Sequence, residues 1–425
     1  MRKSNFLHYF SFVRLFLFFN FSIIEIGWVM SMKDRIIFHI DVNNAFLSWT
    51  AVDLLEKGYP VDIRTIPSVI GGDEEKRRGI VTAKSPVAKK MGVVTAEPLF
   101  MARRKCPNLK VFPGDYQLYK KRSDELYQYF CTFTPTVERF SIDECFLDMT
   151  GTNLIYDDPI KLAYRMKDEI YSKFGYTVNI GIANNKLCAK MASDFEKPNK
   201  VHTLFMNEIP TKMWPLPVSD LFMVGKASSQ VLKDMGIKTI GDLAKMDVSI
   251  LKKRFKSQGD MMHEYANGID YSPVGERNTK NKSISVTETL EKDIEKVSEF
   301  KKILLRQADK VGKQARKEGI YATTIALIFK TSDFISYSHQ IKLVNPTNVT
   351  EEIYKTCISI LDKGWRGEPI RLLGIRLADF TNNNSKQVSI FDQDKDIHND
   401  KIQSVLDDIT DKFGEGVIIP ASLKE

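Results

Sequence analysis

Two adjacent carboxylates interrupt an otherwise apolar stretch of the chain. Asp143 and Glu144 lie within FSIDECFLDMT, residues 140–150, among Phe, Ile, Cys, Leu and Met side chains that suit a core. Neighbouring side chains of a plain strand point to opposite faces of the sheet. One acid would then face the interior, where an unpaired charge is costly. The pair therefore requires a compensating partner.

A turn between two short strands would bring both acids to one end of a sheet. Residues 136–142 and 145–150 both have strand composition, and successive side chains near a turn or bulge can reach the same edge. Asp41, after an apolar strand pattern at 35–41, is a third acid at a strand end. Mg²⁺ prefers such oxygen ligands, and two ions about 4 Å apart can clamp an in-line phosphoryl transfer. Salt-bridged structural acids are the alternative that spacing leaves open.

The elements that would position these acids form a mixed α/β pattern. Apolar residues at helical spacing follow the first strand and stop at Gly58. Further strand patterns occupy 78–83 and 176–183, and further helix patterns occupy 123–133, 159–175 and 184–198.

Composition is consistent with a folded protein of several domains. The chain has 425 residues, which suggests roughly two to four domains. Its formal net charge of +8 is compatible with a nucleic-acid partner. The five cysteines form no CxxC pair, which disfavours a zinc ribbon or disulfide framework and favours a reducing cytosol.

The N-terminal segment imitates a signal peptide without completing the pattern. Arg14, Asn20 and Glu25 interrupt its apolar run, and no small-residue cleavage site follows. We expect the natural start at Met30 or Met32, so that residues 1–31 are a doubtful extension; a membrane anchor is the alternative.

Three motifs carry a family resemblance. HIDVNNAFLSW (39–49), SIDECFLDM (141–149) and GIANNKLCAKMASDFEKPN (181–199) stand in the order and spacing of the palm motifs of Y-family, translesion DNA polymerases of the DinB and UmuC kind. The similarity extends from about Ile36 to Phe391. It implies an α/β (α+β) multidomain, right-hand polymerase, template-directed and of low fidelity, that extends primers with dNTPs and bypasses damaged bases in the bacterial cytoplasm.

The resemblance assigns the metal site and the sugar gate. Asp41, Asp143 and Glu144 would hold two Mg²⁺ ions, helped by the backbone carbonyl of Val42. Phe46 would be the steric gate that clashes with a ribose 2′-OH, although a core aromatic on an amphipathic helix is the alternative.

The resemblance also implies which residues contact the phosphates of the nucleotide. Thr82, Lys89 and Lys186 would contact the triphosphate, where lysine suits a polyanion. In KSPVAKKMG, residues 84–92, Pro86 stands near the position where many members have a tyrosine. The family's stacking tyrosine is therefore missing from this chain.

The second half of the sequence contains patterns that are typical of DNA-binding domains. Residues 218–246 read as helix, Gly225 turn, helix and a second glycine turn, which resembles the helix-hairpin-helix thumb; a simple helical connector is the alternative. From Lys282 the order β-α-β-β-α-β predicts a ferredoxin-like little finger. The DNA contacts implied are Gly225, Lys226, Lys282 and Ser283.

The C-terminal tail carries one further motif. Gln387, Ile390 and Phe391, within QVSIF, resemble the peptide by which bacterial polymerases bind the sliding clamp. From Ser385 onward five lysines face nine acids, so the tail should not lie on phosphates. A short strand packing back on the body is the alternative.

The resemblance thus divides the chain into parts. We expect the palm at 32–44 and 104–200, fingers at 45–103, thumb at 201–270, linker at 271–281, little finger at 282–384 and acidic tail at 385–425. The expected partners are primer–template DNA, dNTPs and the sliding clamp. The rival functions are another palm-fold nucleotidyl transferase or cyclase, and a catalytically silent DNA-binding scaffold.

Overall fold

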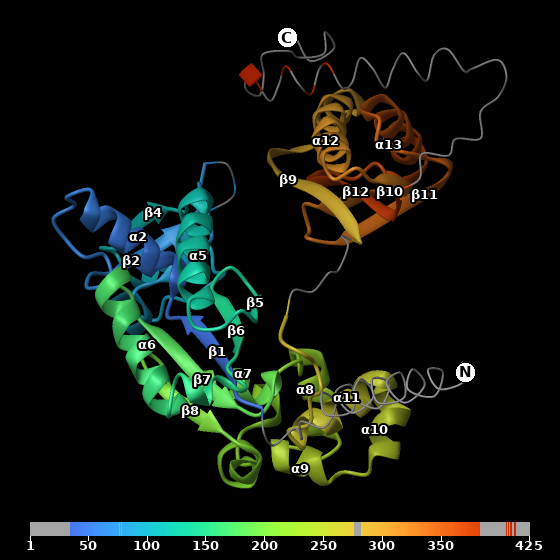
Figure 1. The fold of residues 1–425 in the computed structure, drawn as a ribbon. Helices are drawn as coiled ribbons and strands as arrows, with labels where there is room; N and C mark the ends of the chain where they lie inside the picture. Colours follow the sequence, from blue (N-terminus) through green and yellow to red (C-terminus); the bar gives the residue numbers. More distant parts are fainter. Residues whose placement is uncertain are drawn as a thin grey trace, which may run out of the picture. The chain divides into compact units, whose positions relative to one another are not determined.

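The computed structural model describes residues 35–75, 77, 79–275 and 282–382, with five residues of the tail: Val405, Asp407, Ile409, Lys412 and Phe413 (Figure 1). The chain divides into two compact units, Met1–Gly71 with Val81–Arg277, and Gly72–Ile80 with Asn278–Glu425. The predicted extension at 1–31 and the predicted clamp peptide lie outside the described residues.

The first unit is built around a five-stranded sheet in the order β5-β6-β1-β7-β8. Its central strand is antiparallel to both neighbours, and β8 runs parallel to β7. The strands are β1 (Ile37–Val42), β5 (Val137–Arg139), β6 (Glu144–Asp148), β7 (Val178–Ala183) and β8 (Val201–Leu204).

The residues of β1 alternate between two hydrophobic cores, as the period of a strand requires. Phe38, Ile40 and Val42 pack with α5 (Tyr116–Cys131) and α6 (Pro159–Phe174), which Figure 1 shows beside the sheet. Ile37 instead packs with α7 (Lys186–Ser193). His39 and Asp41 therefore lie on the α7 face.

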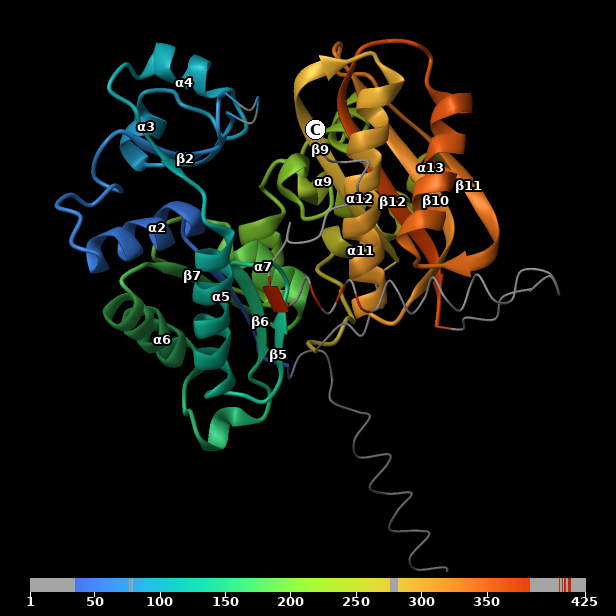
Figure 2. The same ribbon diagram turned by 90° about the horizontal axis from the view of Figure 1, so that it is seen from above.

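A smaller three-stranded sheet follows α2 (Ala45–Glu56) and is flanked by two short helices (Figure 2). Ser85 caps the first of these, its hydroxyl accepting from the backbone N–H of Ala88 at 3.0 Å, and Pro86 is the first helical residue. Proline suits this position because its missing N–H would have no partner there. The elements are β2 (Ser68–Gly71), β3 (Val81–Lys84), β4 (Lys110–Pro113), α3 (Pro86–Lys90) and α4 (Leu99–Lys105).

Four helices form the last part of the first unit: α8 (Lys226–Asp234), α9 (Ile240–Lys245), α10 (Val248–Phe255) and α11 (Ser257–Ala266). Gly225 is the N-cap of α8, and Gly236 has a φ of +85° in the second turn. The predicted helix before Gly225 is only a 3₁₀ turn, Val218–Asp220. The hairpin is thus shorter than the sequence pattern indicated.

The second unit confirms the predicted β-α-β-β-α-β order. Its antiparallel sheet has the order β11-β10-β12-β9, with both helices on one face (Figure 1). Each helix links two parallel strands that a third strand separates. The elements are β9 (Ser283–Ile294), α12 (Val297–Lys317), β10 (Tyr321–Thr331), β11 (Ser336–Thr347), α13 (Thr350–Gly364) and β12 (Ile370–Thr381).

Among the helices that the structure describes, none is long and apolar enough to cross a membrane.

Candidate active site

The three predicted acids come together at one end of β1 and β6. Asp41 and Glu144 are partners in the register of the two strands. The backbone N–H of Val42 donates to the carbonyl of Asp143 at 3.1 Å. Asp143 itself lies in the turn between β5 and β6, and its carboxylate accepts from the Ser141 hydroxyl at 2.6 Å. Because Asp143 lies in a turn, it escapes the alternation that would send it to the opposite face.

Two lysines balance this cluster of negative charge. Lys190 of α7 donates to both oxygens of Glu144 at 3.0 Å. Lys197 follows α7, donates to Asp41 and also pairs with Asp194 at 2.7 Å. Sequence reasoning missed Lys197, although its signal, the EKPN that closes the third motif, was visible. In the described part of the chain, no three His, Cys, Asp or Glu side chains form a ready metal cage.

The surroundings of Asp41 and Glu144 shift the pKa values of the two carboxyl groups in opposite directions. Burial raises the pKa of Asp41 from 3.8 to about 6, although Lys197 opposes the shift. Burial would also raise the pKa of Glu144, but His39 and Lys190 outweigh it and lower that pKa to about 2. Asp41 is only 7% exposed, so its ionised form needs a cation beside it. The oxygen donors and the shared strand end therefore fit a divalent cation.

Phe46 lies on α2 one turn beyond the acids. Its ring is half-buried and stacks on Tyr119 of α5, with centroids 4.6 Å apart and planes 19° from parallel. The Tyr119 hydroxyl lies 3.1 Å from that of Thr50, on the helix of Phe46. The ring is thus fixed by packing yet not enclosed, which suits a gate, and this role stays a prediction.

Lys186 lies in surroundings unlike those of Lys197. Its ammonium is buried, donates to both oxygens of Glu138 at 2.7 and 2.6 Å, and lies 4.9 Å from the centre of the Phe146 ring. The residue is 5% exposed and Glu138 is 2% exposed. The charge that was predicted to meet a triphosphate is therefore already neutralised inside the protein.

The other predicted phosphate contacts lie on the small sheet and its helix. The exposed Thr82 of β3 donates its hydroxyl proton to the carbonyl of Ile70 at 2.9 Å, so that proton is not available to a phosphate. Lys89 is exposed on α3. In the part of the chain that the structure describes, neither residue has a hydrogen bond or ion pair with the acid cluster, and both roles stay predictions.

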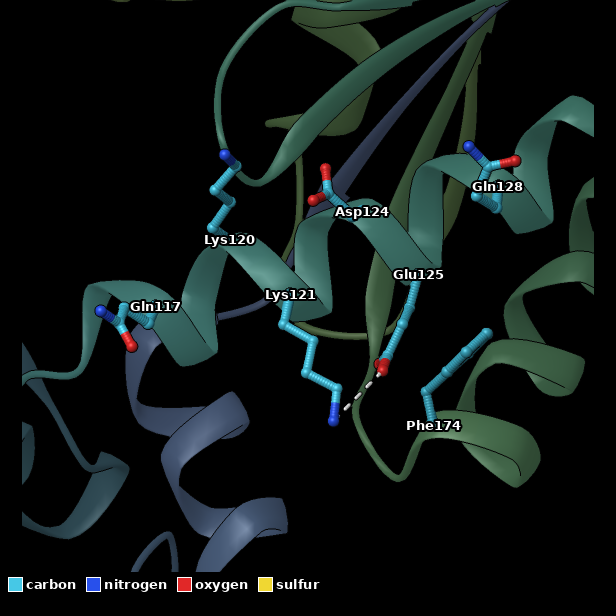
Figure 3. A pocket seen from close by; sticks show the side chains of 7 residues that line it. All are labelled: Gln117, Lys120, Lys121, Asp124, Glu125, Gln128 and Phe174. Atoms are coloured by element: carbon cyan, nitrogen blue, oxygen red, sulfur yellow. Dashed lines mark ion pairs between the residues drawn. The ribbon is translucent and has the colours of Figure 1, made fainter. Parts of the chain in front are cut away.

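An open hollow on the outer side of α5 lies away from this chemistry (Figure 3). Lys121 and Glu125 pair across it at 3.9 Å. Its walls include none of the three acids: they are Gln117, Lys120, Lys121, Asp124, Glu125, Gln128 and Phe174.

The sheet of the second unit has one face that its helices leave open. In register, Ser285, Arg376, Ala326 and Gln340 form one row across β9, β12, β10 and β11. The adjacent rows are Ser283–Ala378–Thr324–Lys342, Thr287–Gly374–Ile328–Ser338 and Thr289–Leu372–Lys330–Ser336. Most of this face consists of hydroxyls, small residues and a few cations, and Ile328 and Leu372 are its large apolar members.

Of the predicted DNA-contact residues, Ser283 is exposed at the start of β9 and Lys282 precedes it, also exposed. Gly225 and Lys226 lie at the N-terminus of α8, where a side chain at Gly225 would meet nothing within 4 Å. All four are accessible, and their contacts with DNA stay predictions.

Comparison with known proteins identifies the class. Residues 40–194 match the model of the impB/mucB/samB family, 281–390 match that family's C-terminal domain, and 219–270 match the DNA polymerase-iota thumb domain. The chain therefore belongs to the impB/mucB/samB family, within the Y-family of DNA polymerases.

Individual relatives narrow this to the bacterial, DinB-like members. The chain is 46% identical over 391 residues to a DNA polymerase IV of Clostridium acetobutylicum, covering 92% of this chain and 98% of the relative. It is 34% identical over 400 residues to DNA polymerase IV 2 of Bacillus subtilis, covering 92% and 95%. A solved Y-family DNA polymerase chimera, Dbh-Dpo4(243-245)-Dbh, shares the fold with a TM-score of 0.70 and 22% identity, over 82% of this chain and all of the chimera.

Proposed function

We propose that Asp41, Asp143 and Glu144 hold two Mg²⁺ ions and that nucleotide addition takes place beside them. The chain is a DNA-directed DNA polymerase of the low-fidelity, translesion class. The observation that carries the site is the register pairing of Asp41 with Glu144 and the adjoining Asp143 turn. The Val42 carbonyl, next to Asp41, is a fourth oxygen for the nucleotide-associated ion.

The chain's own residues position the reaction. Bound divalent cations would polarise the α-phosphate of the dNTP and lower the pKa of the primer 3′-OH. Asp41 and Glu144 are held at adjacent strand positions, so their spacing is fixed before substrate arrives. Phe46, braced by Tyr119, limits the space at the sugar and favours deoxynucleotides. Positioning and electrostatics carry most of the rate enhancement in such transfers.

We assign the triphosphate contact to Lys197 in place of Lys186. The Lys197 side chain is 38% exposed and pairs with Asp41, whereas that of Lys186 is 6% exposed and pairs with Glu138. When this ammonium turns to a phosphate, the Asp41 carboxylate that it leaves is one that a divalent cation would take. Lys186 cannot do so, because Glu138 would then be ionised inside the core. Lys89 and Thr82 remain secondary candidates on the small sheet.

The open sheet face of the second unit is proposed to lie on the DNA backbone. Small residues on this face, such as Ala326 and Ala378, let a phosphate strand approach the sheet closely. The partly exposed Arg376, in the middle of this face, supplies a guanidinium that suits a phosphate. Lys282 and Ser283 extend the face at one edge, and Gly225 with Lys226 would contact phosphate from the first unit.

The tail is proposed to bind the sliding clamp through Gln387, Ile390 and Phe391, in the cytoplasm. Apolar anchors in a polar, acidic segment are typical of peptides that dock in a groove on a partner.

Primer extension by the full chain tests the catalytic assignment. Asp143→Ala should abolish extension, since a carboxylate at the reacting centre is lost. The matched control is Asp168→Ala on α6, which removes a carboxylate whose side chain is 71% exposed and should leave the rate unchanged. Equal extension by the wild type and Asp143→Ala would overturn the catalytic assignment of Asp143, whereas no extension by either would favour the silent scaffold. Cyclisation of a nucleotide without primer extension would favour a cyclase.

A further inference from the structure

Asn179 is a buried amide beside the acid cluster to which the proposed mechanism assigns no role. It lies on β7, is 0% exposed, and is the register partner of Asp41 on the neighbouring strand β1. An apolar side chain could occupy this position without needing any hydrogen bond, whereas a buried amide without partners would cost free energy. The partners of Asn179 therefore indicate what the amide does.

The side chain of Asn179 makes four hydrogen bonds, which uses its full capacity as an amide. Its Nδ2 donates to the carbonyl of Ser193 at 3.0 Å and to that of Glu196 at 2.6 Å. Its Oδ1 accepts from the backbone N–H of Lys200 at 3.2 Å and from the Nδ2 of Asn43 at 3.1 Å. These partners fix the orientation of the amide, because a flipped group would turn its oxygen towards two carbonyls.

The bonds hold the loop between α7 and β8 on both sides of Lys197. Glu196, the residue before Lys197, is bound to Asn179 through its carbonyl. Asn199, two residues after Lys197, donates its backbone N–H to the Oδ1 of Asn43 at 2.8 Å. The two anchoring asparagines are joined to each other by a further hydrogen bond. The backbone that carries the lysine ammonium is therefore fixed at the edge of the acid cluster.

We propose that Asn179 is a positioning residue for Lys197: its amide fixes the loop from which the lysine ammonium reaches a triphosphate. This inference rests on the proposed function, because it takes Lys197 as the triphosphate contact. A side chain that starts from a fixed backbone loses less conformational entropy on binding than one whose backbone must also be ordered. Asn179 acts through the loop and touches no substrate.

Single-nucleotide incorporation by the full chain on primer–template DNA tests this role as a double-mutant cycle. Asn179→Leu keeps a side chain of similar size and removes all four hydrogen bonds, so it should raise the KM for dNTP roughly tenfold. In a chain that already carries Lys197→Met, the same substitution should change the KM by less than about twofold, because no ammonium is left to position. A residue that only supported the fold would act equally in both chains.

Asn184→Leu is the matched control. Asn184 directly follows β7 and is 6% exposed. It likewise binds backbone groups, the carbonyl of Arg35 at 3.1 Å and the N–H of Met206 at 3.4 Å, and these two partners lie outside the loop that carries Lys197. This variant should lower the free energy of unfolding and leave the KM unchanged. An equal rise of the KM in this control would make the effect one of general destabilisation and overturn the role of Asn179.

The outcomes separate this inference from the proposed function. An unchanged KM in Lys197→Met overturns the assignment of Lys197 itself. A raised KM in Lys197→Met together with an unchanged KM in Asn179→Leu overturns only the role of Asn179, and so does an equal rise from Asn179→Leu in both chains. If Asn179→Leu fails to fold, Asn43→Ala decides, because it removes the anchor on Asn199: a KM equal to that of the wild type in this variant rejects the proposal.

Discussion

The same substitution at two lysines of the third motif should have opposite consequences. Lys186→Met would leave the carboxylate of Glu138 buried without its ion pair, and that carboxylate also accepts from the backbone N–H of Gly275 at 3.2 Å. Breaking one side of a buried pair costs about 3–5 kcal/mol. Lys197→Met removes a partly exposed ammonium from Asp41, whose raised pKa of about 6 allows that carboxylate to take up a proton instead, so the loss of stability should be smaller. Only the first substitution should therefore destabilise the fold substantially.

Nucleotide binding should respond in the reverse order. Loss of one charge-assisted contact with the triphosphate costs about 1.5–3 kcal/mol, so Lys197→Met should raise the KM for dNTP by roughly ten- to a hundredfold. Lys186→Met should leave the KM of the folded fraction unchanged. A Lys186→Met chain that also carries Glu138→Leu removes both charges and should regain most of the lost stability.

Two measurements decide between these lysines. Urea unfolding of the metal-free chain gives the free energy of unfolding, and single-nucleotide incorporation gives the KM. If Lys186→Met unfolds at the urea concentration of the wild type while its KM rises, Lys186 is the phosphate ligand after all. A destabilised Lys197→Met with an unchanged KM would be equally damaging to our reasoning.

Three further predictions follow from the site and the tail. Phe46→Ala should admit ribonucleotides by opening space at the sugar, and an unaltered ratio of dNTP to NTP incorporation would reject the gate. In the metal-free chain, the raised pKa of Asp41 means that the folded state binds its proton more tightly than the unfolded chain. This group should therefore lower the free energy of unfolding by about 3 kcal/mol as the pH rises from about 4 to 6; Asp41→Asn should abolish that component, and identical pH profiles would contradict it. Deleting residues 387–391 should abolish stimulation by the clamp but spare basal extension, and stimulation that persists would refute the tail assignment.

The hairpin around Asp143 could be predicted from the sequence because its signals are local. Two short apolar runs flank the acids, and the turn between them needs no information from distant residues. The β-α-β-β-α-β unit could be predicted for the same reason, since long periodic segments define each element. The strand pattern before Asp41 indicated a third acid at a strand end, and the resemblance to a family then favoured a metal site over salt-bridged structural acids.

The buried environment of Lys186 could not be predicted from the sequence, for a physical reason. The helix pattern was carried through Pro198, whereas α7 ends at Ser193, so Lys197 was treated as part of a helix although it lies beyond it. Asn185 caps α7, and the first helical residue, Lys186, meets Glu138, which is 48 residues away in sequence. Hydrophobic periodicity describes one helix or strand at a time. The residues around Lys186 therefore give no sign that its ammonium pairs with a buried carboxylate on β5. The helix predicted before Gly225 was too long for a similar reason. Its apolar residues Val218, Leu221 and Val224 pack into the hydrophobic core that also contains α7.

With the roles proposed for Lys197 and Asp41, their contact would make ligand binding an exchange of cations. A divalent ion that binds to Asp41 would displace the ammonium of Lys197. A triphosphate that attracts this ammonium would leave Asp41 available to the ion. Each ligand would therefore lower the free-energy cost of breaking the Lys197–Asp41 ion pair for the other ligand. By thermodynamic reciprocity the nucleotide must raise metal affinity by the same factor by which the metal raises nucleotide affinity. One lysine can in this way make two weak ligands bind cooperatively.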